Sequence, residues 1–407
     1  MTAFADLGVP QRLVSVLSKQ GITHPFPIQQ AAIGDLMAGR DVLGRAPTGS
    51  GKTLAFGLPL VAQVGKAAPR KPRALVLAPT RELAEQISLQ LRPLAKELGR
   101  FVFAIYGGVG YDLQRRQLNR GVDLVVATPG RLADLIGEGT MSLEHIEQVV
   151  VDEADRMADM GFMPQVRRLL DQTPARRQTA LFSATLDGDV AELTRRYQVE
   201  PVLHEVGAVD GHPETAHYFW QVPLGERLEL TAEIIRSTSP SLIFTRTRHG
   251  ADRLVRQLRV TRVDAEAIHG GRSQGQRTRA LQAFSSGRVE ALVATDVAAR
   301  GIHVDGVACV VHYDLASDPK DYLHRSGRTA RAGTGGVVVS LVGVEQIGEL
   351  RRLQRALGFH DALHDPDNGW LRPQGGSRIG ERPSPMSSDQ PHSASRRRRP
   401  GRRTRRR

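Results

Sequence analysis

The sequence predicts an α/β protein in which two parallel sheets, each with helices on both faces, are followed by a disordered basic tail. Two observations lead to this fold class. Short continuous apolar runs alternate with helical stretches, which is typical of parallel strands buried on both faces, and the alternation begins again after residue 213. We therefore expect a first domain at 1–204, a linker at 205–216, a second domain at 217–361 and the tail at 362–407.

The first domain is expected to begin with a helix between Thr2 and about Phe26. This helix is rich in Leu and Val, ends at Gly21 and is followed by Pro25 and Pro27. The apolar runs then start, and each is predicted to be a strand of the first sheet. These runs are 41–45, 74–78, 101–106, 123–127, 149–151 and 179–182.

The second domain repeats this pattern after a stretch of looser composition at 205–213. Most polar or glycine-containing clusters in both domains follow a predicted strand directly, at the edge where open α/β sheets bind ligands. We therefore expect one functional edge on each sheet. The strands predicted for the second sheet are 241–244, 265–268, 290–294, 307–311 and 336–341.

A phosphate-binding loop is predicted at residues 46–53, which read APTGSGKT and follow the first strand. Small residues let backbone N–H groups turn toward an anion, and the N-terminus of the next helix adds favourable charge. The lysine suits the β- and γ-phosphates, and the final threonine hydroxyl can bind Mg²⁺. The alternative is a glycine-rich turn with an incidental lysine. The residues expected to contact nucleotide are Thr48, Gly49, Ser50, Gly51, Lys52 and Thr53.

Two adjacent acids, Asp152 and Glu153, follow the apolar strand at 149–151. They supply the second component that a nucleotide hydrolase needs. Asp152 can hold Mg²⁺, and Glu153 can orient or deprotonate the attacking water. Acids after a strand also mark ordinary solvated turns, so this interpretation depends on the phosphate-binding loop.

Arg328 and Arg331 supply a cation for the transferring phosphoryl group, which the first domain's motifs lack. The two residues are three apart, so they share a face of a helical turn, and guanidinium groups bind phosphate in a bidentate manner. The alternative is a basic surface helix that makes ion pairs. If these arginines act on a nucleotide held by the first domain, hydrolysis requires the domains to close.

The single cysteine and the absence of a long apolar run bear on location. Cys309 lies in an apolar stretch, so an intramolecular disulfide is impossible and a reducing compartment fits. No leader pattern and no run of membrane-spanning length is present. We expect a cytoplasmic protein that does not enter a membrane.

With these motifs in view, the chain resembles the DEAD-box ATP-dependent RNA helicases from Phe4 to about Leu341. Residues 152–155 spell the family name, Asp-Glu-Ala-Asp, and ten further motifs match in order. The resemblance implies two RecA-like domains, ATP and Mg²⁺ between them, and a single RNA strand across both edges.

The resemblance also implies roles around the ATP base and ribose. Phe4 would stack on the adenine ring and Gln29 would bind the adenine edge, as an amide can. His303 would lie at the ribose, and Gly301 would be a further ATP contact. His303 stands where most relatives carry Asp, and a neutral imidazole can still accept a hydrogen bond, so we expect altered nucleotide affinity without loss of hydrolysis.

RNA-contacting and coupling residues are implied in the same way. Hydroxyls, arginines and exposed N–H groups suit contacts with phosphates and 2′-hydroxyls that do not depend on base sequence. Ser183 and Thr185 resemble the element that couples ATP to RNA by bonding to the Asp155 region, and His324 resembles another coupling residue. The implied RNA contacts are Thr80, Arg81, Gly108, Thr128 and Arg131 in the first domain and Thr245, Gln274, Arg277 and Thr295 in the second.

The basic tail dominates the charge of the chain. Formal net charge is +13, and the nine arginines of residues 396–407 account for all but +4 of it. A strongly basic balance favours a polyanionic partner. The tail is interpreted as an RNA tether that acts through counterion release, with inert solvated disorder as the alternative.

The sequence thus predicts an ATP-dependent RNA helicase that grips one strand and locally separates short duplexes. One alternative is an RNA-stimulated ATPase that acts as a clamp or a scaffold for ribonucleoprotein assembly, and another is a DNA translocase. The expected partners are single-stranded or short duplex RNA and ribonucleoprotein assemblies. We expect the protein to act as a monomer.

Overall fold

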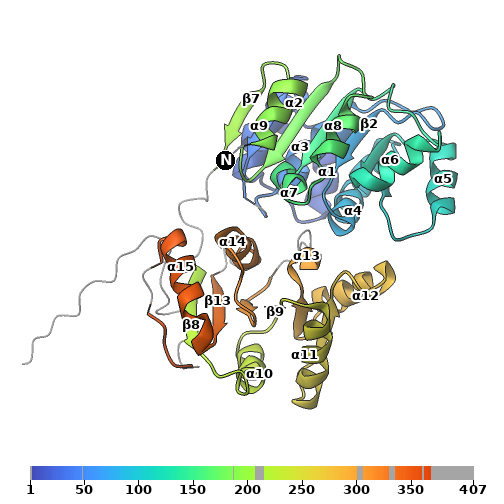
Figure 1. The fold of residues 1–407 in the computed structure, drawn as a ribbon. Helices are drawn as coiled ribbons and strands as arrows, with labels where there is room; N and C mark the ends of the chain where they lie inside the picture. Colours follow the sequence, from blue (N-terminus) through green and yellow to red (C-terminus); the bar gives the residue numbers. More distant parts are fainter. Residues whose placement is uncertain are drawn as a thin grey trace, which may run out of the picture.

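The computed structural model describes residues 2–47, 49–186, 188–206, 215–299, 306–329, 335–359 and 362–367, which form two α/β domains (Figure 1). The strand pairs of both sheets are parallel. The predicted fold class of two parallel sheets is confirmed. Residues 368–407 of the expected tail lie outside the described residues.

The first domain alternates strands and helices. Its elements are η1 (Ala5–Leu7), α1 (Gln11–Lys19), α2 (Pro27–Met37), β1 (Val42–Arg45), α3 (Lys52–Gln63), β2 (Ala74–Leu77), α4 (Arg81–Glu97), β3 (Val102–Ile105), α5 (Tyr111–Arg120), β4 (Leu124–Ala127), α6 (Pro129–Gly137), β5 (Gln148–Asp152), α7 (Ala154–Asp159), α8 (Met163–Leu170), β6 (Gln178–Ser183), α9 (Asp189–Tyr197) and β7 (Val202–Glu205). Within the described residues the sheet has seven strands in the order β3-β4-β2-β5-β6-β1-β7. This order brings the ends of β5, β6 and β1 together.

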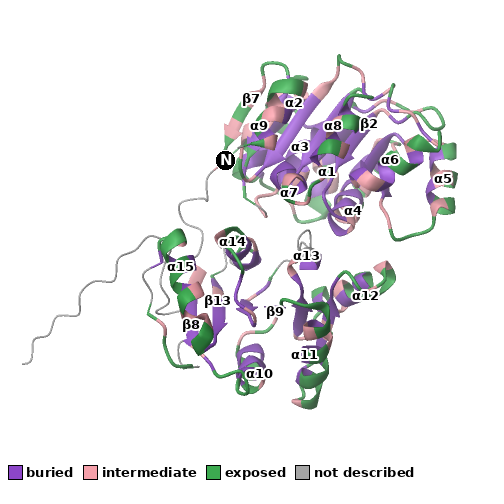
Figure 2. Cartoon of the chain, viewed as in Figure 1, coloured by how far each residue is buried: buried purple, intermediate pink, exposed green. Residues whose placement is uncertain are grey.

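Side chains that alternate along each strand of this sheet pack into two separate cores. Val76 of β2 joins a core with helices α1 to α4, whereas its neighbours Leu75 and Leu77 join a core with helices α5 to α9. All three are fully buried. Because both faces are covered, such strands are continuously apolar and do not alternate with polar residues. Figure 2 shows the buried interior of the domain and the exposed outer sides of its helices.

The second domain repeats this arrangement. Its elements are β8 (Thr215–Gln221), α10 (Arg227–Ser237), β9 (Ser241–Phe244), α11 (Arg248–Val260), β10 (Ala265–Ile268), α12 (Gln274–Ser285), β11 (Ala291–Ala294), α13 (Asp296–Ala299), β12 (Cys309–His312), α14 (Pro319–Ser326), β13 (Gly336–Val342), η2 (Val344–Gln346) and α15 (Ile347–Leu357). The strand order is β10-β11-β9-β12-β13-β8. Helices α10 and α11 cover one core and helices α12 to α15 the other. Cys309 is fully buried in the first of these cores, as its apolar neighbours predict.

Three elements differ from the sequence prediction. Strands β7 and β8 were not predicted, and they occupy both ends of the segment expected to be a linker, since β7 ends at Glu205 and β8 begins at Thr215. The predicted N-terminal helix was too long. Pro10 stands at the N-cap of α1, which covers only Gln11–Lys19, and a single 3₁₀ turn precedes it.

The two domains face each other through segments that follow strand ends. Glu82 of α4 contacts α12 through Gln274, and Asp159 of α7 contacts α14 through Lys320. Figure 1 shows α12, α13 and α14 on the side of the second domain nearest α4 and α7. No helix among the described residues is both long and apolar enough to cross a membrane.

Candidate functional site

The loop between β1 and α3 has a backbone that turns sharply into the helix. Gly49 and Gly51 have φ angles of 87° and 86°, a left-handed conformation that costs glycine little. A Cβ atom at Gly51 would lie only 2.5 Å from Nε2 of Gln29, so a side chain could not be accommodated there without a shift. The loop therefore leads directly to the N-terminus of α3, where the helix dipole attracts anions.

Lys52 is held inside this loop. Its Nζ donates a hydrogen bond to the carbonyl oxygen of Ala46 at 2.9 Å, and its side chain is buried. The Ser50 hydroxyl donates to the carbonyl oxygen of Pro47 at 2.8 Å, while Thr53 is half-buried in the first turn of α3. A phosphate entering the loop would thus meet an ammonium already in place.

Gln29 and Phe4 lie beside the loop in positions that the expected base contacts do not describe. The Gln29 amide donates to the carbonyl oxygen of Gly51 and accepts from the backbone N–H of Phe26, both at 2.9 Å, so here it braces the loop. Phe4 is only 1% exposed and belongs to the core around α1 and α2, so its ring offers a base no open face in this structure. Their roles toward adenine stay predictions.

Asp152 and Glu153 stand at the end of β5 in different electrostatic surroundings. Burial raises the pKa of Asp152 to about 7, and the neighbouring Glu153 adds to this while Lys52 opposes it. Burial also acts to raise the pKa of Glu153, but Arg156, Lys52 and Arg328 outweigh it and lower that pKa to about 2. Nη1 of Arg156 lies 2.7 Å from Oε2 of Glu153. Glu153 therefore stays ionised, and its backbone has a left-handed φ of 50°.

Asp155 connects the α7 helix to the end of β6. Its Oδ2 accepts hydrogen bonds from the backbone N–H groups of Ala184 and Thr185, each at 3.2 Å, and its own N–H donates to the Ser183 hydroxyl at 3.2 Å. The bonding expected between these segments is present. The coupling function assigned to it stays a prediction.

Residues of both domains line one cavity of about 180 Å³, which we call the nucleotide cavity. Arg328 thus shares a cavity with Lys52 and Glu153, and its charge contributes to the low pKa of Glu153. Burial, together with Arg156 and Arg328, lowers the pKa of His324 and so favours a neutral imidazole. The lining residues are Pro47, Lys52, Glu153, Asp155, Arg156 and Ala184 from the first domain and Leu323, His324, Gly327 and Arg328 from the second.

Helix α14, which leads to Arg328, is fixed by the buried side chain of Arg325. Its Nε and Nη2 atoms lie 2.6 Å and 2.7 Å from the two carboxylate oxygens of Asp296, and Nη1 donates to the carbonyl oxygen of Asp314 at 2.7 Å. Such a bidentate pair holds a helix in a defined orientation. Arg325 therefore supports the position of Arg328 without lining the nucleotide cavity itself.

A second cavity of about 450 Å³ also lies between the domains, and we call it the interdomain groove. Five residues predicted to contact RNA line it, and Gly108 lies against the Arg81 guanidinium at its side. Arg131 stacks on the Tyr111 ring, with its guanidinium carbon 3.8 Å from the ring centre. The groove-lining predicted residues are Thr80, Arg81, Thr128 and Arg131 from the first domain and Arg277 from the second.

The predicted RNA-contacting residues of the second domain are not all available to a ligand in this structure. Nε2 of Gln274 donates to Oε1 of Glu82 at 3.0 Å. Nη2 of Arg277 lies 3.0 Å from the other carboxylate oxygen of Glu82, Oε2. Thr245 and Thr295 are buried and do not line the interdomain groove. Their roles in RNA binding stay predictions.

Four predicted site residues lie outside the described residues. Two were expected at the phosphates, one at the ribose and one as a further ATP contact, and the described part of the chain includes none of them. They are Thr48, Arg331, Gly301 and His303.

Comparison with known proteins identifies the family. The model for DEAD/DEAH box helicases matches residues 26–193, and that for the helicase conserved C-terminal domain matches residues 226–333. The ATP-dependent RNA helicase RhlB of Pseudomonas putida is 37% identical over 384 residues, covering 91% of this chain and 96% of RhlB. This chain belongs to the DEAD-box ATP-dependent RNA helicases.

A second relative and a solved structure extend the comparison. The chloroplastic DEAD-box ATP-dependent RNA helicase 3B of Zea mays is 42% identical over 377 residues, and the match spans 89% of this chain but only half of the maize protein. Dbp5 of Saccharomyces cerevisiae, solved with RNA and ADP BeF₃, superposes with a TM-score of 0.79 at 28% identity and covers 91% of this chain and 97% of that one. The two domains are therefore RecA-like.

Two charged residues of these sites, Arg156 and Glu82, were not predicted from sequence. Arg156 binds Glu153, and its spacing of three residues on a short helix was the available signal. Glu82 bridges to the second domain, and no local spacing could reveal a partner 192 residues away.

Proposed function

We propose that this DEAD-box protein is an RNA-dependent ATPase that separates short RNA duplexes. The nucleotide cavity carries this proposal, because Lys52 and Glu153 of one domain meet Arg328 of the other there. A triphosphate bound in it would touch both domains, so binding favours their apposition and hydrolysis weakens it. The names of the relatives, ATP-dependent RNA helicases, support the same activity.

Lys52 and the backbone N–H groups of residues 49–51 would hold the β- and γ-phosphates. Asp152 and Thr53 would hold Mg²⁺, which when bound neutralises phosphate charge. Their oxygen donors fit this ion, and a cation would favour the ionised form of the buried Asp152 carboxylate. No group of three or more His, Cys, Asp or Glu residues in the described ranges could hold a metal. This fits an ion that takes most of its ligands from phosphates and water.

Glu153 would orient the attacking water. A general base works best with a pKa near the operating pH, and the pKa of Glu153 is instead lowered to about 2 by Arg156, Lys52 and Arg328 against the effect of burial. A permanently ionised carboxylate is a strong hydrogen-bond acceptor, so it fixes a water molecule more effectively than it removes a proton. Of the two roles that the sequence allows for Glu153, orientation of the attacking water is therefore favoured over its deprotonation.

Arg328 would stabilise the charge that develops on the transferring phosphoryl group. It reaches the nucleotide cavity only from the second domain, so the catalytic set is complete only when the domains are apposed. We assign the same role to Arg331.

The interdomain groove would bind one RNA strand. Thr80, Thr128 and the arginines that line it come from both domains, so a strand lying there depends on the same apposition as the nucleotide. Hydroxyl and guanidinium groups suit phosphates and 2′-hydroxyls of any base sequence. ATP binding and strand binding would thereby favour each other.

The test measures ATP hydrolysis with no polymer, with single-stranded RNA and with DNA of the same sequence, beside strand separation of a short RNA duplex. RNA-specific stimulation with ATP-dependent separation supports the proposal. Equal stimulation by DNA would indicate a DNA translocase. RNA-stimulated hydrolysis without separation would indicate a clamp or assembly scaffold.

We further propose that the protein acts as a monomer in the cytoplasm. Its partners would be single-stranded or short duplex RNA, and ribonucleoprotein assemblies that contain such RNA. Both halves of each cavity come from one chain, which supports the monomer. Its single cysteine, Cys309, is buried, which fits a reducing compartment.

A further inference from the structure

Arg272 lines the interdomain groove but belongs to none of the residue sets described above. It lies in the turn between β10 and α12, and its side chain is one-third exposed. Arg81, Arg131 and Arg277 line the same groove. Arg272 thus adds a fourth guanidinium to a groove that the proposed function assigns to RNA.

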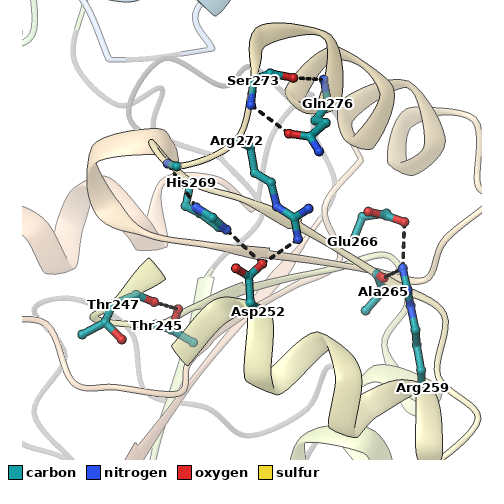
Figure 3. A network of polar contacts seen from close by, with 11 residues as sticks. Thr245, Thr247, Asp252, Arg259, Ala265, Glu266, His269, Arg272, Ser273 and Gln276 are labelled. Atoms are coloured by element: carbon teal, nitrogen blue, oxygen red, sulfur yellow. Dashed lines mark hydrogen bonds and ion pairs between the residues drawn. The ribbon is translucent and has the colours of Figure 1, made fainter. Parts of the chain in front are cut away.

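A small polar network fixes the Arg272 side chain from behind, and Figure 3 shows it converging with His269 on Asp252. Nη2 of Arg272 lies 2.6 Å from Oδ1 of Asp252, and Nε2 of His269 lies 3.0 Å from the same oxygen. The carboxylate therefore links a buried imidazole to a guanidinium at the groove.

The hydrogen bonds around His269 settle the orientation of the network. The backbone N–H of Gly271 donates to Nδ1 of His269 at 3.2 Å, so a neutral imidazole carries its proton on Nε2 and donates it to Asp252. A Cβ atom at Gly271 would lie 3.1 Å from Nδ1, which is tighter than ordinary contact. Glycine therefore allows the turn to close on the ring.

The charge balance of the groove leaves Arg272 suited to an anion. A guanidinium has five N–H donors, of which Asp252 engages one or more at Nη2. Nε is itself buried, so the exposed third of the side chain is the part open to a ligand. The acidic residues that line the groove are Glu82, which is paired with Arg277, and Asp134. A backbone phosphate in the groove would accept hydrogen bonds from the exposed donors that Asp252 leaves unengaged.

We propose that Arg272 binds a backbone phosphate of RNA in the interdomain groove, and that Asp252 and His269 position it for that contact. This inference rests on the proposed RNA binding. An arginine held in one orientation before the ligand arrives loses less side-chain entropy on binding. The contact is to phosphate, so it adds affinity without base preference.

The first experiment compares Arg272→Ala with Arg259→Ala in the full chain. Arg259 is a matched control, because it pairs with Glu266 at 2.8 Å in the same domain and does not line the groove. Fluorescence anisotropy with labelled single-stranded RNA and a non-hydrolysable ATP analogue gives Kd at several salt concentrations. We expect Arg272→Ala to weaken binding about 10-fold for any base sequence and to reduce the salt slope by about 0.7, the value for one phosphate contact on a single strand.

Arg259→Ala should leave RNA affinity and salt slope unchanged. An Arg272→Ala variant with the same Kd for RNA as the unaltered chain would overturn the proposal. If only its thermal unfolding temperature fell, the pair of Arg272 with Asp252 would be structural and would have no role in RNA binding. An unaltered chain that binds no RNA would instead reject the proposed function before Arg272 is tested. The two failures are therefore distinguishable.

The second experiment tests positioning through a double-mutant cycle. The KM for RNA and the kcat of RNA-stimulated ATP hydrolysis are measured for Asp252→Asn with Arg272 intact and with Arg272→Ala. When Arg272 is present, we expect Asp252→Asn to raise the KM for RNA severalfold, because the guanidinium loses the group that positions it. When Arg272 is replaced by Ala, we expect Asp252→Asn to have no further effect on KM. The kcat should be unchanged in both backgrounds. Equal effects in both backgrounds, or none in either, would overturn the positioning role.

Discussion

At the scale of single residues, the buried ion pair between Arg156 and Glu153 allows a sharp test of stability. Both side chains are less than 10% exposed. Arg156→Ala would leave a carboxylate buried next to Asp152, so we expect a loss of about 3–5 kcal/mol in the free energy of unfolding, measured by urea denaturation. Arg196→Ala is the control, because its pair with Asp171 is exposed and should contribute less than about 1 kcal/mol. Equal losses in the two variants would contradict this account.

Glu153→Gln tests the assignment of the water-orienting group. The amide keeps the shape of the side chain but loses the charge that holds a water molecule, so we expect ATP and RNA to bind while turnover falls by on the order of 10²-fold or more. Lys52→Ala should instead abolish ATP binding or turnover. Filter binding of labelled ATP beside a phosphate-release assay separates the two effects. Normal turnover by Glu153→Gln would assign the water to another residue.

Much of the site's residue chemistry was readable from sequence because it lies in contiguous motifs. The phosphate-binding loop and the acids after β5 fall together at one sheet edge, as parallel topology requires. What sequence could not give was how each group is already engaged. The Gln29 amide braces the loop at Gly51, and Phe4 is buried, because tertiary packing decides these contacts.

At the scale of elements, the two strands that were not predicted, β7 and β8, both lie at an edge of their sheet. β7 is a short edge strand whose Leu203 is 50% exposed, so it lacks the continuous apolar run of a buried strand. β8 is also at an edge of its sheet, and its signal was the aromatic run Tyr218, Phe219 and Trp220. Aromatic residues favour strands, and that preference could have identified β8.

An aromatic cluster joins β8, β12 and α14, and its two buried histidines predict that acid destabilises the second domain. Nδ1 of His217 shares a 2.8 Å hydrogen bond with the Tyr322 hydroxyl, and its ring packs on Phe359. The ring of His312 packs against Tyr322 in a tilted arrangement. Burial lowers the pKa of His217 to about 4. Burial, with Arg325 and His217 nearby, also lowers the pKa of His312. Both rings are therefore neutral in the folded domain.

The sign of the pH dependence follows from these shifts. Unfolded histidine titrates near pH 6.5, so between about pH 6.5 and 4 the unfolded chain binds more protons and stability falls as pH falls. For His217 the full loss is about 3 kcal/mol. His217→Gln keeps a polar group near Tyr322 without titrating in this range. Urea unfolding at pH 7.5 and 4.5 should show a smaller acid loss in the variant, and an unchanged loss would remove His217 from the explanation.

At the scale of the whole molecule, the arrangement of the two domains combines motifs that are distant in sequence. The expectation that Arg328 meets Lys52 across a cavity followed from the chemistry of phosphoryl transfer, since the first domain's motifs lacked a cation to neutralise the charge on the transferring phosphoryl group. The pairing of Glu82 with Gln274 and Arg277 could not be predicted. It depends on how two separately folded cores approach, and neither periodicity nor local spacing encodes that distance.

The ion pair between Asp159 and Lys320 gives a test of that approach away from both ligands. Oδ1 of Asp159 on α7 and Nζ of Lys320 on α14 lie 2.6 Å apart, and neither residue lines the nucleotide cavity. Lys320→Glu would place like charges at this contact, so we expect kcat/KM for RNA-stimulated hydrolysis to fall by about 2–5-fold at low salt, the range of a partly exposed pair. Thermal unfolding should be unchanged, since each domain keeps its own core.

Combining Asp159→Lys with Lys320→Glu restores opposite charges in reversed order and should recover most of the lost rate. Salt supplies a second control, because at about 1 M the Debye length falls to about 3 Å and the single and double variants should converge. A single reversal that leaves the low-salt rate unchanged would mean that this contact does not contribute to domain apposition during turnover. A double variant as slow as the single one would assign the effect to local disturbance of α7 or α14 instead.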